Sequence, residues 1–381
     1  MHKLPGIYIH IPFCKQTCYY CNFHFSTSLK YKESFLKALF KEIKLRKDYL
    51  NNEPVKTVYF GGGTPSIISG QEIQYIFDEL SKYHSIDPNA EITLEANPDD
   101  LISAEKQLLK SLQNTPVNRL SIGVQSFFDE DLRFMNRAHS AGEALNSVKA
   151  SQDAGFGNIN IDLLFAIQTM TNEKWERNLD IACSLDIQHM SAYCLMIEPK
   201  TVFSAFIKKG KIEDIDEQKE VTHFELLMKK MRSNKFIHYE ICNFCKQGFA
   251  SKHNIIYWSN EKYLGLGPSA HSFNGETRQW NVSNNNKYIR SVETGDPFYE
   301  MEHLSENTRY NEYILTSLRM SQGADLNYIK SRFGQDVLTY TINEAKNYIN
   351  SGMIKNLKNK LVLSDKGKLF ADKIAAELFL V

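Results

Sequence analysis

The chain has 381 residues, of which 42% are hydrophobic, and its 45 Lys and Arg residues balance 45 Asp and Glu residues. This composition excludes a disordered or fibrous chain and predicts one large domain or two ordinary ones. Because the formal net charge is zero, no net cationic field favours a nucleic acid or an anionic membrane, and we expect neither as a partner. Seven cysteines in a chain of this length suit a reducing compartment better than a disulfide scaffold.

The first residues lack the features of a secretory signal. Only Lys3 precedes a short strand-like segment, and no long apolar segment accompanies it. No uninterrupted apolar run approaches the roughly 18 to 20 residues that a membrane-spanning helix needs. We therefore expect no transmembrane segment and a cytoplasmic location.

Short apolar or β-branched segments alternate with longer helical segments over about the first two hundred residues. In the first helical segment, residues 31–50, apolar side chains recur at steps of three and four, as one buried helix face requires. Successive βα units predict a parallel sheet with right-handed crossovers. The six predicted strands are Gly6 to Ile11, Val55 to Phe60, Glu91 to Ala96, Arg119 to Val124, Asn158 to Phe165 and His189 to Leu195.

Polar and sulfur-containing residues occupy the ends of five successive predicted strands. They are Cys14, the segment 61–64, the segment 95–98, the pair Gln125 and Ser126, and Asp162. In a (β/α) barrel the loops at the carboxyl ends of the strands converge on one cavity, whereas an open sheet offers a single crevice. The sequence therefore predicts an α/β fold containing an incomplete, TIM-like (β/α)6 barrel.

The pattern changes after about residue 200, and we expect three regions. Residues 1–235 form the barrel, residues 236–303 form a loop-rich extension, and residues 304–381 form a mainly helical domain that resembles a winged helix. This last region has eleven Lys and Arg residues against eight Asp and Glu residues, too small an excess for duplex binding, so we expect a lid or a partner surface. Its predicted elements, after a helix at Asp216 to Lys235, are helices at Arg309 to Arg319, Leu326 to Phe333, Leu338 to Ser351 and Lys366 to Phe379 and strands at Ile354 to Asn356 and Leu361 to Leu363.

The strongest chemical signal is the triplet Cys14-x3-Cys18-x2-Cys21. Three thiolates within eight residues can hold one compact metal centre, because iron-sulfur clusters and zinc both select soft thiolate ligands. A cubane cluster held by three cysteines leaves one iron open to another ligand. A structural zinc site with His24 as the fourth ligand, or three reduced core thiols, would also fit the spacing.

Further motifs make the pattern specific. The triplet after the first strand and Tyr-Phe-Gly-Gly-Gly-Thr-Pro-Ser at 59–66 resemble the radical S-adenosylmethionine (SAM) family, and within it the subgroup of oxygen-independent coproporphyrinogen III oxidase and HemW-type heme chaperones. The resemblance extends over nearly the whole chain. It includes the motifs Glu-Ala-Asn-Pro at 95–98, Arg-Leu-Ser-Ile-Gly-Val-Gln-Ser-Phe at 119–127, Asn-Arg-Ala-His at 136–139 and Tyr-Leu-Gly-Leu-Gly-Pro-Ser-Ala-His-Ser at 263–272.

The resemblance implies two cofactors and their ligands. Cys14, Cys18 and Cys21 would hold a [4Fe-4S] cluster, and SAM would chelate its open iron and be cleaved to a radical, chemistry that belongs to the cofactor while the protein binds and orients it. The glycines can bring backbone groups close to a ligand because they lack a Cβ atom. The implied SAM contacts are Tyr8, Tyr20, Gly62, Gly63, Thr64, Glu95, Gln125, Arg137 and Asp162.

Two departures separate the members of the subgroup. The oxidase pattern has a further cysteine two positions after the triplet, where this chain has Phe23, as the heme chaperones do. The chain also has the chaperone signature His-Asn-x-x-Tyr-Trp, which implies that His253, Tyr257 and Trp258 contact heme, with His253 as an axial ligand or attachment point. The loop at 166–170 lacks the Gly and Pro of its relatives, so we transfer no site from it.

Three hypotheses follow. The leading one is a heme chaperone that carries the cluster and SAM and delivers heme to client haemoproteins, respiratory ones among the candidates, with an unidentified electron donor and a homodimer as expected partners. The alternative is a coproporphyrinogen III dehydrogenase that makes protoporphyrinogen IX, which Phe23 disfavours. The third is a zinc-stabilised interaction protein. Cys242 and Cys245 could be a redox pair, a metal clip, a heme thiolate source or two incidental thiols.

Overall fold

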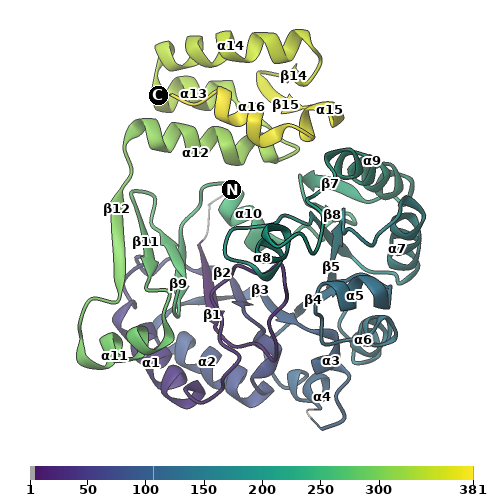
Figure 1. Cartoon of the computed structure of the whole chain (residues 1–381). Coiled ribbons are helices and arrows are strands. Elements are labelled where there is room, and N and C mark those ends of the chain that lie inside the picture. The colour runs from purple at the N-terminus through teal and green to yellow at the C-terminus, as the bar shows by residue number, and fades with distance from the viewer. Residues whose placement is uncertain (1–4, 106, 381) are drawn as a thin grey trace.

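The computed structural model of the protein describes residues 5–105 and 107–380. Its centre is a run of six parallel strands that lie side by side in chain order, as in a barrel wall (Figure 1). The alternating pattern of the sequence therefore predicted the parallel order correctly. The strands are β1 (Gly6–Ile11), β2 (Val55–Gly62), β3 (Ile86–Ala96), β4 (Arg119–Gln125), β5 (Ile159–Phe165) and β6 (His189–Cys194).

Helices cover the outer face of these strands because apolar residues alternate along each strand. In β1, Ile7, Ile9 and Ile11 are fully buried in the main core, together with Phe35 and Leu39 of α1. Capping boxes, in which Ser69 or Ser140 pairs with a glutamate three residues later, fix the starts of α2 and α6. The connecting helices are α1 (Lys32–Leu45), η1 (Pro65–Ile67), α2 (Gly70–Tyr83), α3 (Pro98–Leu101), α4 (Leu108–Leu112), α5 (Asp129–Phe134), α6 (Ala141–Asp153) and α7 (Asn172–Ser184).

The barrel is open because further strands pair with both of its edge strands. The strand β9 lies parallel to β1, and β8 lies antiparallel to β6, so β1 and β6 do not meet. The complete sheet has twelve strands, and the six outer ones were not among the predicted elements. They are β7 (Ile237–Glu240), β8 (Asn243–Cys245), β9 (Tyr263–Leu266), β10 (His271–Phe273), β11 (Thr277–Asn281) and β12 (Tyr299–His303).

Four more helices accompany the outer strands: α8 (Val202–Lys208), α9 (Glu217–Ser233), α10 (Lys252–Trp258) and α11 (Asn285–Thr294). The helix α9 matches the predicted helix at Asp216 to Lys235 to within two residues at each end. The short α10 carries the His-Asn-x-x-Tyr-Trp signature. No helix in the described ranges is both long enough and apolar enough to cross a membrane.

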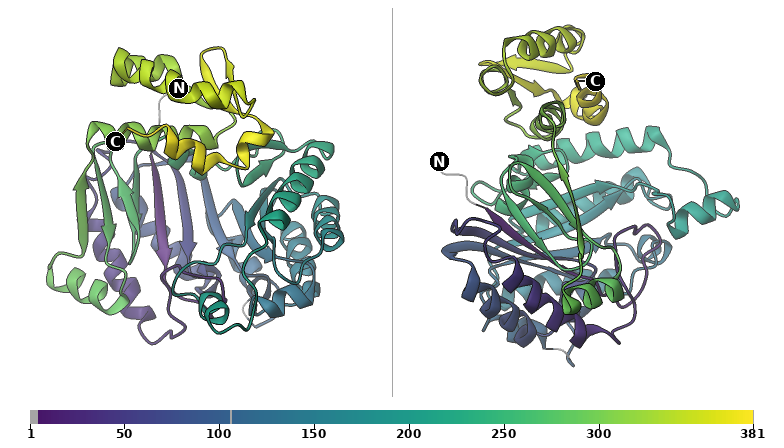
Figure 2. Two further views of the ribbon diagram at one scale, coloured as in Figure 1. Left: turned by 45° about the horizontal axis from the view of Figure 1, so that its top comes forward. Right: turned by 90° about the vertical axis from the view of Figure 1, so that its left-hand side faces the viewer.

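The C-terminal elements have a hydrophobic core of their own, centred on Tyr310, Ile314 and Leu318. Figure 2 shows them beyond the end of the sheet where the first described residues lie, away from the carboxyl ends of the parallel strands. The predicted helices and hairpin are present, but the last predicted helix is two short ones because the backbone leaves the helical conformation at Phe370. The elements are α12 (Glu306–Arg319), β13 (Ala324–Asp325), α13 (Leu326–Phe333), α14 (Gln335–Asn350), β14 (Ile354–Leu357), β15 (Lys360–Leu363), α15 (Asp365–Lys368) and α16 (Ala371–Glu377).

Candidate active site in the barrel

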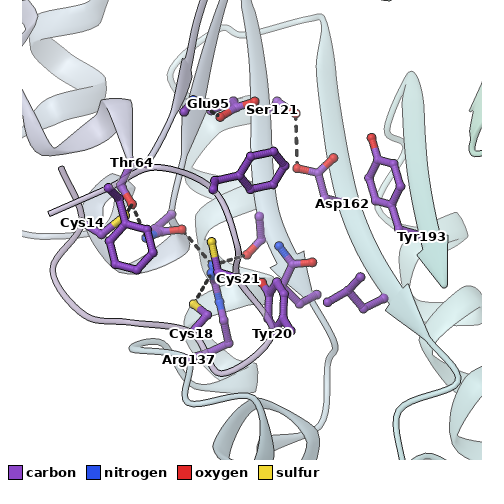
Figure 3. A pocket seen from close by; sticks show the side chains of 18 of the residues that line it. Cys14, Cys18, Tyr20, Cys21, Thr64, Glu95, Ser121, Arg137, Asp162 and Tyr193 are labelled. Atoms are coloured by element: carbon purple, nitrogen blue, oxygen red, sulfur yellow. Dashed lines mark hydrogen bonds between the residues drawn. The ribbon is translucent and has the colours of Figure 1, made fainter. Parts of the chain in front are cut away.

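A cavity of about 480 Å³ opens at the carboxyl ends of the parallel strands. Figure 3 shows the cysteine thiols gathered on one side of this cavity, with Asp162 and Tyr193 on the other. Strands that are far apart in the sequence therefore supply one site, as the barrel prediction requires. Of the residues predicted to bind the cluster or SAM, those that line the cavity are Cys14, Cys18, Tyr20, Cys21, Gly62, Gly63, Thr64, Glu95, Gln125, Arg137 and Asp162.

The three cysteines lie on the loop that follows β1. Backbone hydrogen bonds close this loop, since the amide of Ser26 donates to the carbonyl of Pro12 at 2.9 Å and the amide of Cys14 donates to the carbonyl of Ser26 at 3.0 Å. The hydroxyl of Thr64 donates to the Cys14 thiol at 3.4 Å, and the Arg137 guanidinium donates to the Cys18 thiol at 3.3 Å. The next strand and a more distant loop thus hold the sulfur atoms in position.

The arrangement of the thiols bears on the zinc alternative. Within the described part of the chain, no three His, Cys, Asp or Glu side chains surround a point where one metal ion would bind. His24, the fourth ligand of the zinc alternative, instead forms a 2.7 Å hydrogen bond with Asn285. A [4Fe-4S] cluster is larger than one ion, and each of its thiolates binds a different iron. Burial raises the pKa of Cys14 to about 11, so cluster binding must displace a proton from this thiol.

The glycine segment at the end of β2 is packed too closely for side chains. Gly62 has a φ of +112°, and a Cβ atom there would lie 2.6 Å from the His10 ring. A Cβ atom on Gly63 would lie 2.6 Å from the carbonyl oxygen of Phe13 and 3.0 Å from the Cys14 thiol. The glycines therefore let the β2 loop lie directly against the cysteine loop, and their own backbone lines the cavity.

Two half-buried carboxyl groups face the cavity from β3 and β5, the strands on either side of β4. Glu95 accepts hydrogen bonds from the Tyr59 hydroxyl at 2.7 Å and the Gly62 amide at 3.2 Å. Burial raises the pKa of Glu95 to about 7, and it also raises the pKa of Asp162, which accepts a 2.7 Å hydrogen bond from Asn160. Both groups can accept hydrogen bonds from an ammonium group or a ribose when they are ionised.

Arg137 connects several walls of the site. One of its nitrogens donates to the side-chain oxygen of Asn97 at 2.8 Å and to the carbonyl of Gly123 at 2.9 Å. Its Nε atom is buried without a partner among the described residues. Gln125 has a φ of +65° at an irregularity between β4 and β5, which turns the end of the strand beside this guanidinium. The site can therefore bind a carboxylate close to the cysteine loop.

The remaining predicted residues lie outside this cavity lining. The hydroxyl of Tyr8 is 3.2 Å from Nδ1 of His10, and its ring stacks on that of Tyr59, with 6.1 Å between centroids. His253, Tyr257 and Trp258 lie on α10, at the amino end of the strands. The structure therefore separates the predicted heme residues from the cysteine loop.

His253 is enclosed in the barrel interior, with 1% of its surface exposed. Its Nδ1 atom lies 2.7 Å from the Thr57 hydroxyl, and its Nε2 atom lies 2.9 Å from the Tyr257 hydroxyl. Burial lowers the pKa of His253 to about 3, so the imidazole is neutral. Asn254, the next residue of the signature, lines the cavity, and α10 therefore forms part of its floor.

The helix α10 also contacts the C-terminal elements. The guanidinium of Arg319 in α12 lies 5.0 Å from the centroid of the Trp258 ring, a cation–π arrangement. The same side chain donates to Asp372 at 3.0 Å and to the thiol of Cys242 at 3.6 Å. Cys242 and Cys245 are both free thiols, and burial raises the pKa of each, to about 12 and about 11. Both thiols are therefore protonated at neutral pH.

Several residues of the site were not predicted from the sequence. Arg119 lines the cavity, as do the exposed side chains of Phe23, Tyr193 and Met196 at its mouth. The sequence does contain a signal for Arg119, because residues 119, 121, 123 and 125 alternate along β4 and must face the same side.

Comparisons with known proteins agree with this geometry. Residues 8–182 match the family model of the Radical SAM superfamily, and residues 304–370 match that of the HemN C-terminal domain. The chain is 34% identical over 376 residues to a Bacillus subtilis (strain 168) protein named heme chaperone HemW, with 97% of this chain and 98% of that protein covered. This chain belongs to the HemW family of radical SAM proteins.

A second HemW protein, from Escherichia coli (strain K12), is 30% identical over 395 residues, and the match covers 100% of both chains. The solved structure of coproporphyrinogen III oxidase (HemN) from Escherichia coli, described as a radical SAM enzyme, matches with a TM-score of 0.84 at 21% identity, over 99% of this chain and 90% of that one. This likeness confirms the predicted fold class, an α/β radical SAM fold with a C-terminal helical region. Membership of the superfamily implies a [4Fe-4S] cluster and SAM, and the thiols, glycines and carboxyls of this HemW-family cavity fit both.

Proposed function

We propose that this protein is a heme chaperone that binds heme and transfers it to client haemoproteins. The observation that carries the proposal is the similarity over the whole chain to proteins named heme chaperone HemW. Phe23 at the position of the oxidase's additional cysteine, together with the complete signature on α10, supports the same function.

In this proposal Cys14, Cys18 and Cys21 hold the [4Fe-4S] cluster, which supplies an electron to SAM when both are bound. The protein's own groups orient the cofactor: Gly62 and Gly63 present backbone beside the cysteine loop, and Arg137 can donate to a carboxylate. The further SAM contacts that we propose, on the basis of their sequence positions, are Tyr8, Tyr20, Thr64, Glu95, Gln125 and Asp162.

We propose His253 as an imidazole ligand of the heme iron, with Tyr257 and Trp258 as apolar surface for the porphyrin. Since both ring nitrogens of His253 have hydrogen-bond partners, ligation requires Tyr257 or Thr57 to release one of them. The contact of Arg319 with Trp258 would then change as well, because His253 and Trp258 lie on the same short helix, α10. Heme binding would in this way be coupled to the C-terminal elements.

A second candidate function is the radical decarboxylation of coproporphyrinogen III, which the shared fold with HemN favours. One paired experiment separates the two. Reconstituted and reduced protein is incubated with SAM and coproporphyrinogen III, and a second sample is titrated with heme while the Soret band is recorded. We expect a saturable Soret shift and no decarboxylated product. Formation of protoporphyrinogen IX would overturn the chaperone proposal.

The ligand role of His253 is tested in the same titration. We expect His253→Ala to lower heme affinity and to change the Soret position, because imidazole coordination is lost. The matched control is His271→Ala, which removes an exposed imidazole on β10. Undiminished heme binding by His253→Ala would refute the ligand role without refuting the chaperone.

A further inference from the structure

Arg119 is a buried cation that the described residues leave without a partner. It lies on β4, lines the cavity and has 2% of its surface exposed. Its Nε atom has no hydrogen-bond partner, and among the described residues the guanidinium forms no ion pair. A buried guanidinium is retained in a protein only when acceptors compensate for its lost hydration, so the missing acceptors point to a ligand.

The position of Arg119 distinguishes it from the cation near the cysteines. Arg119 pairs with Thr93 in the β3–β4 register, one inward-facing residue deeper in the barrel than the pair Glu95 and Ser121. Arg137, by contrast, contacts Cys18 beside the cluster loop. The cavity therefore has two separate guanidinium groups, one next to the thiols and one towards the floor.

Two carboxyl groups and two imidazoles lie near Arg119. Arg119 interacts electrostatically with Glu95 and Asp162, and burial raises the pKa of both carboxyl groups. His189 and His253 also face this part of the interior, and burial together with Arg119 lowers the pKa of each, so both rings are neutral. Burial therefore disfavours the ionised form of both carboxyl groups, which reduces the negative charge that a further carboxylate would meet at the guanidinium.

Three large apolar side chains are exposed at the same cavity. Phe23 is 70% exposed, Met196 is 63% exposed and Tyr193 is 39% exposed, and all three line the opening. Exposed aromatic and thioether side chains around a cavity mark a surface for a large apolar ligand. A ligand that matches both features has an extended apolar ring system and at least one carboxylate side chain.

We propose that Arg119 binds a propionate carboxylate of heme, with the porphyrin edge against Phe23, Tyr193 and Met196. This inference rests on the proposed heme-chaperone function and assigns a binding site for the heme that the chaperone would carry. A guanidinium forms charge-assisted hydrogen bonds with a carboxylate, and Arg119, which lines the cavity, would donate them from its terminal nitrogens. His253 is close enough to Arg119 for the guanidinium to lower its pKa, so the two proposed heme contacts lie in the same part of the barrel.

The test compares hemin with hemin dimethyl ester, in which both carboxylates are blocked, by Soret titration in the same detergent. We expect the wild-type protein to bind hemin at least about tenfold more tightly than the ester, as a buried charge-assisted pair allows. Arg119→Gln should bind both ligands with the affinity that wild type has for the ester. Arg119→Lys should keep part of the preference for hemin over the ester, because lysine retains the positive charge but lacks the paired N–H donors of a guanidinium.

The matched control is Arg133→Gln, which removes an exposed positive charge from α5 and should keep the wild-type preference. Equal binding of hemin and ester by wild type, or an unchanged preference in Arg119→Gln, would overturn the inference while leaving the chaperone function intact. The comparison of hemin with its dimethyl ester uses the wild-type protein alone, so its result does not depend on whether a variant folds. Failure of wild type to bind either ligand would instead refute the proposed function.

Discussion

The hydroxyl of Thr57 lies 2.7 Å from Nδ1 of His253, so the signature helix α10 is attached to the start of β2. The other ring nitrogen is engaged by Tyr257 on the same helix. A neutral, doubly hydrogen-bonded imidazole therefore closes the barrel at the end opposite the cysteine loop. This contact makes the signature a structural element as well as the proposed heme contact.

We expect Thr57→Val to lower the free energy of unfolding by about 1–3 kcal/mol, because the buried Nδ1 atom of His253 loses its partner. Urea unfolding of the two proteins at pH 7 measures the difference. The matched control, Thr222→Val, removes a hydroxyl that only bonds back to its own helix, and we expect a change within about 0.5 kcal/mol. Equal effects of the two substitutions would show that the contact contributes nothing specific.

Each of the variants Cys14→Ala, Cys18→Ala and Cys21→Ala should lose nearly all cluster iron and sulfide, because we propose that the three thiolates together hold one cluster. Iron and acid-labile sulfide are measured per chain after anaerobic reconstitution. Cys183→Ala is the control, because this thiol lies on α7, away from the cavity. Bound zinc without sulfide in the wild-type protein would contradict the cluster assignment.

Gly63→Ala should displace the cysteine loop, because its Cβ atom would lie 2.6 Å from the carbonyl oxygen of Phe13. We expect a loss of about 1–3 kcal/mol in stability, typical of overpacking, together with reduced cluster content and weaker SAM binding. Gly157→Ala adds the same methyl group where no atom lies within 4 Å. Thermal unfolding and iron analysis of both variants measure the contrast, and a normal cluster content in Gly63→Ala would argue against close packing of the two loops.

The free energy of unfolding of the cofactor-free protein should fall as the pH rises towards 7, because the pKa of Glu95 is higher in the folded protein than in the unfolded chain. Its pKa is raised from 4.5 to about 7, so between these values the folded protein keeps a proton that the unfolded chain releases. The stabilisation is present at low pH and is lost as the carboxyl ionises, by an amount on the order of 3 kcal/mol. The measurement is the unfolding free energy of wild type minus that of Glu95→Gln between pH 5 and 8. A flat difference would show that burial does not shift this group.

The parallel strands could be predicted because they are buried on both faces and are separated by long amphipathic helices. The strand Gly6–Ile11 has the predicted bounds, and each of the other five differs from its predicted bounds by a few residues at one end. The outer strands carry weaker patterns. All residues of β12 are exposed, and β10 has only three residues, so neither alternation nor length identifies them in the sequence.

Part of the candidate site could likewise be predicted from the sequence, and part could not. The cysteine loop, the glycines and the strand-end carboxyls could be placed together because one barrel rim collects them. The environment of His253 could not be predicted, since it depends on Thr57, which is nearly two hundred residues away in the chain. Arg119 was overlooked because it is the first residue of β4, at the opposite end from the predicted site residues, and only its alternation with Gln125 indicates that it faces the cavity.

Backbone hydrogen bonds of Ser26 with Pro12 and Cys14 join the two ends of the cysteine loop. These bonds offset part of the entropy of closing the loop, so thiolate–iron bonds do not have to supply all of it. Small zinc domains unfold when their metal leaves, because the metal provides their folding free energy. Here most of the core lies in the strands and helices of the barrel, so we expect oxygen damage to the cluster to leave a folded chain that can be reloaded. Repair of the site then requires iron, sulfide and electrons, but no refolding.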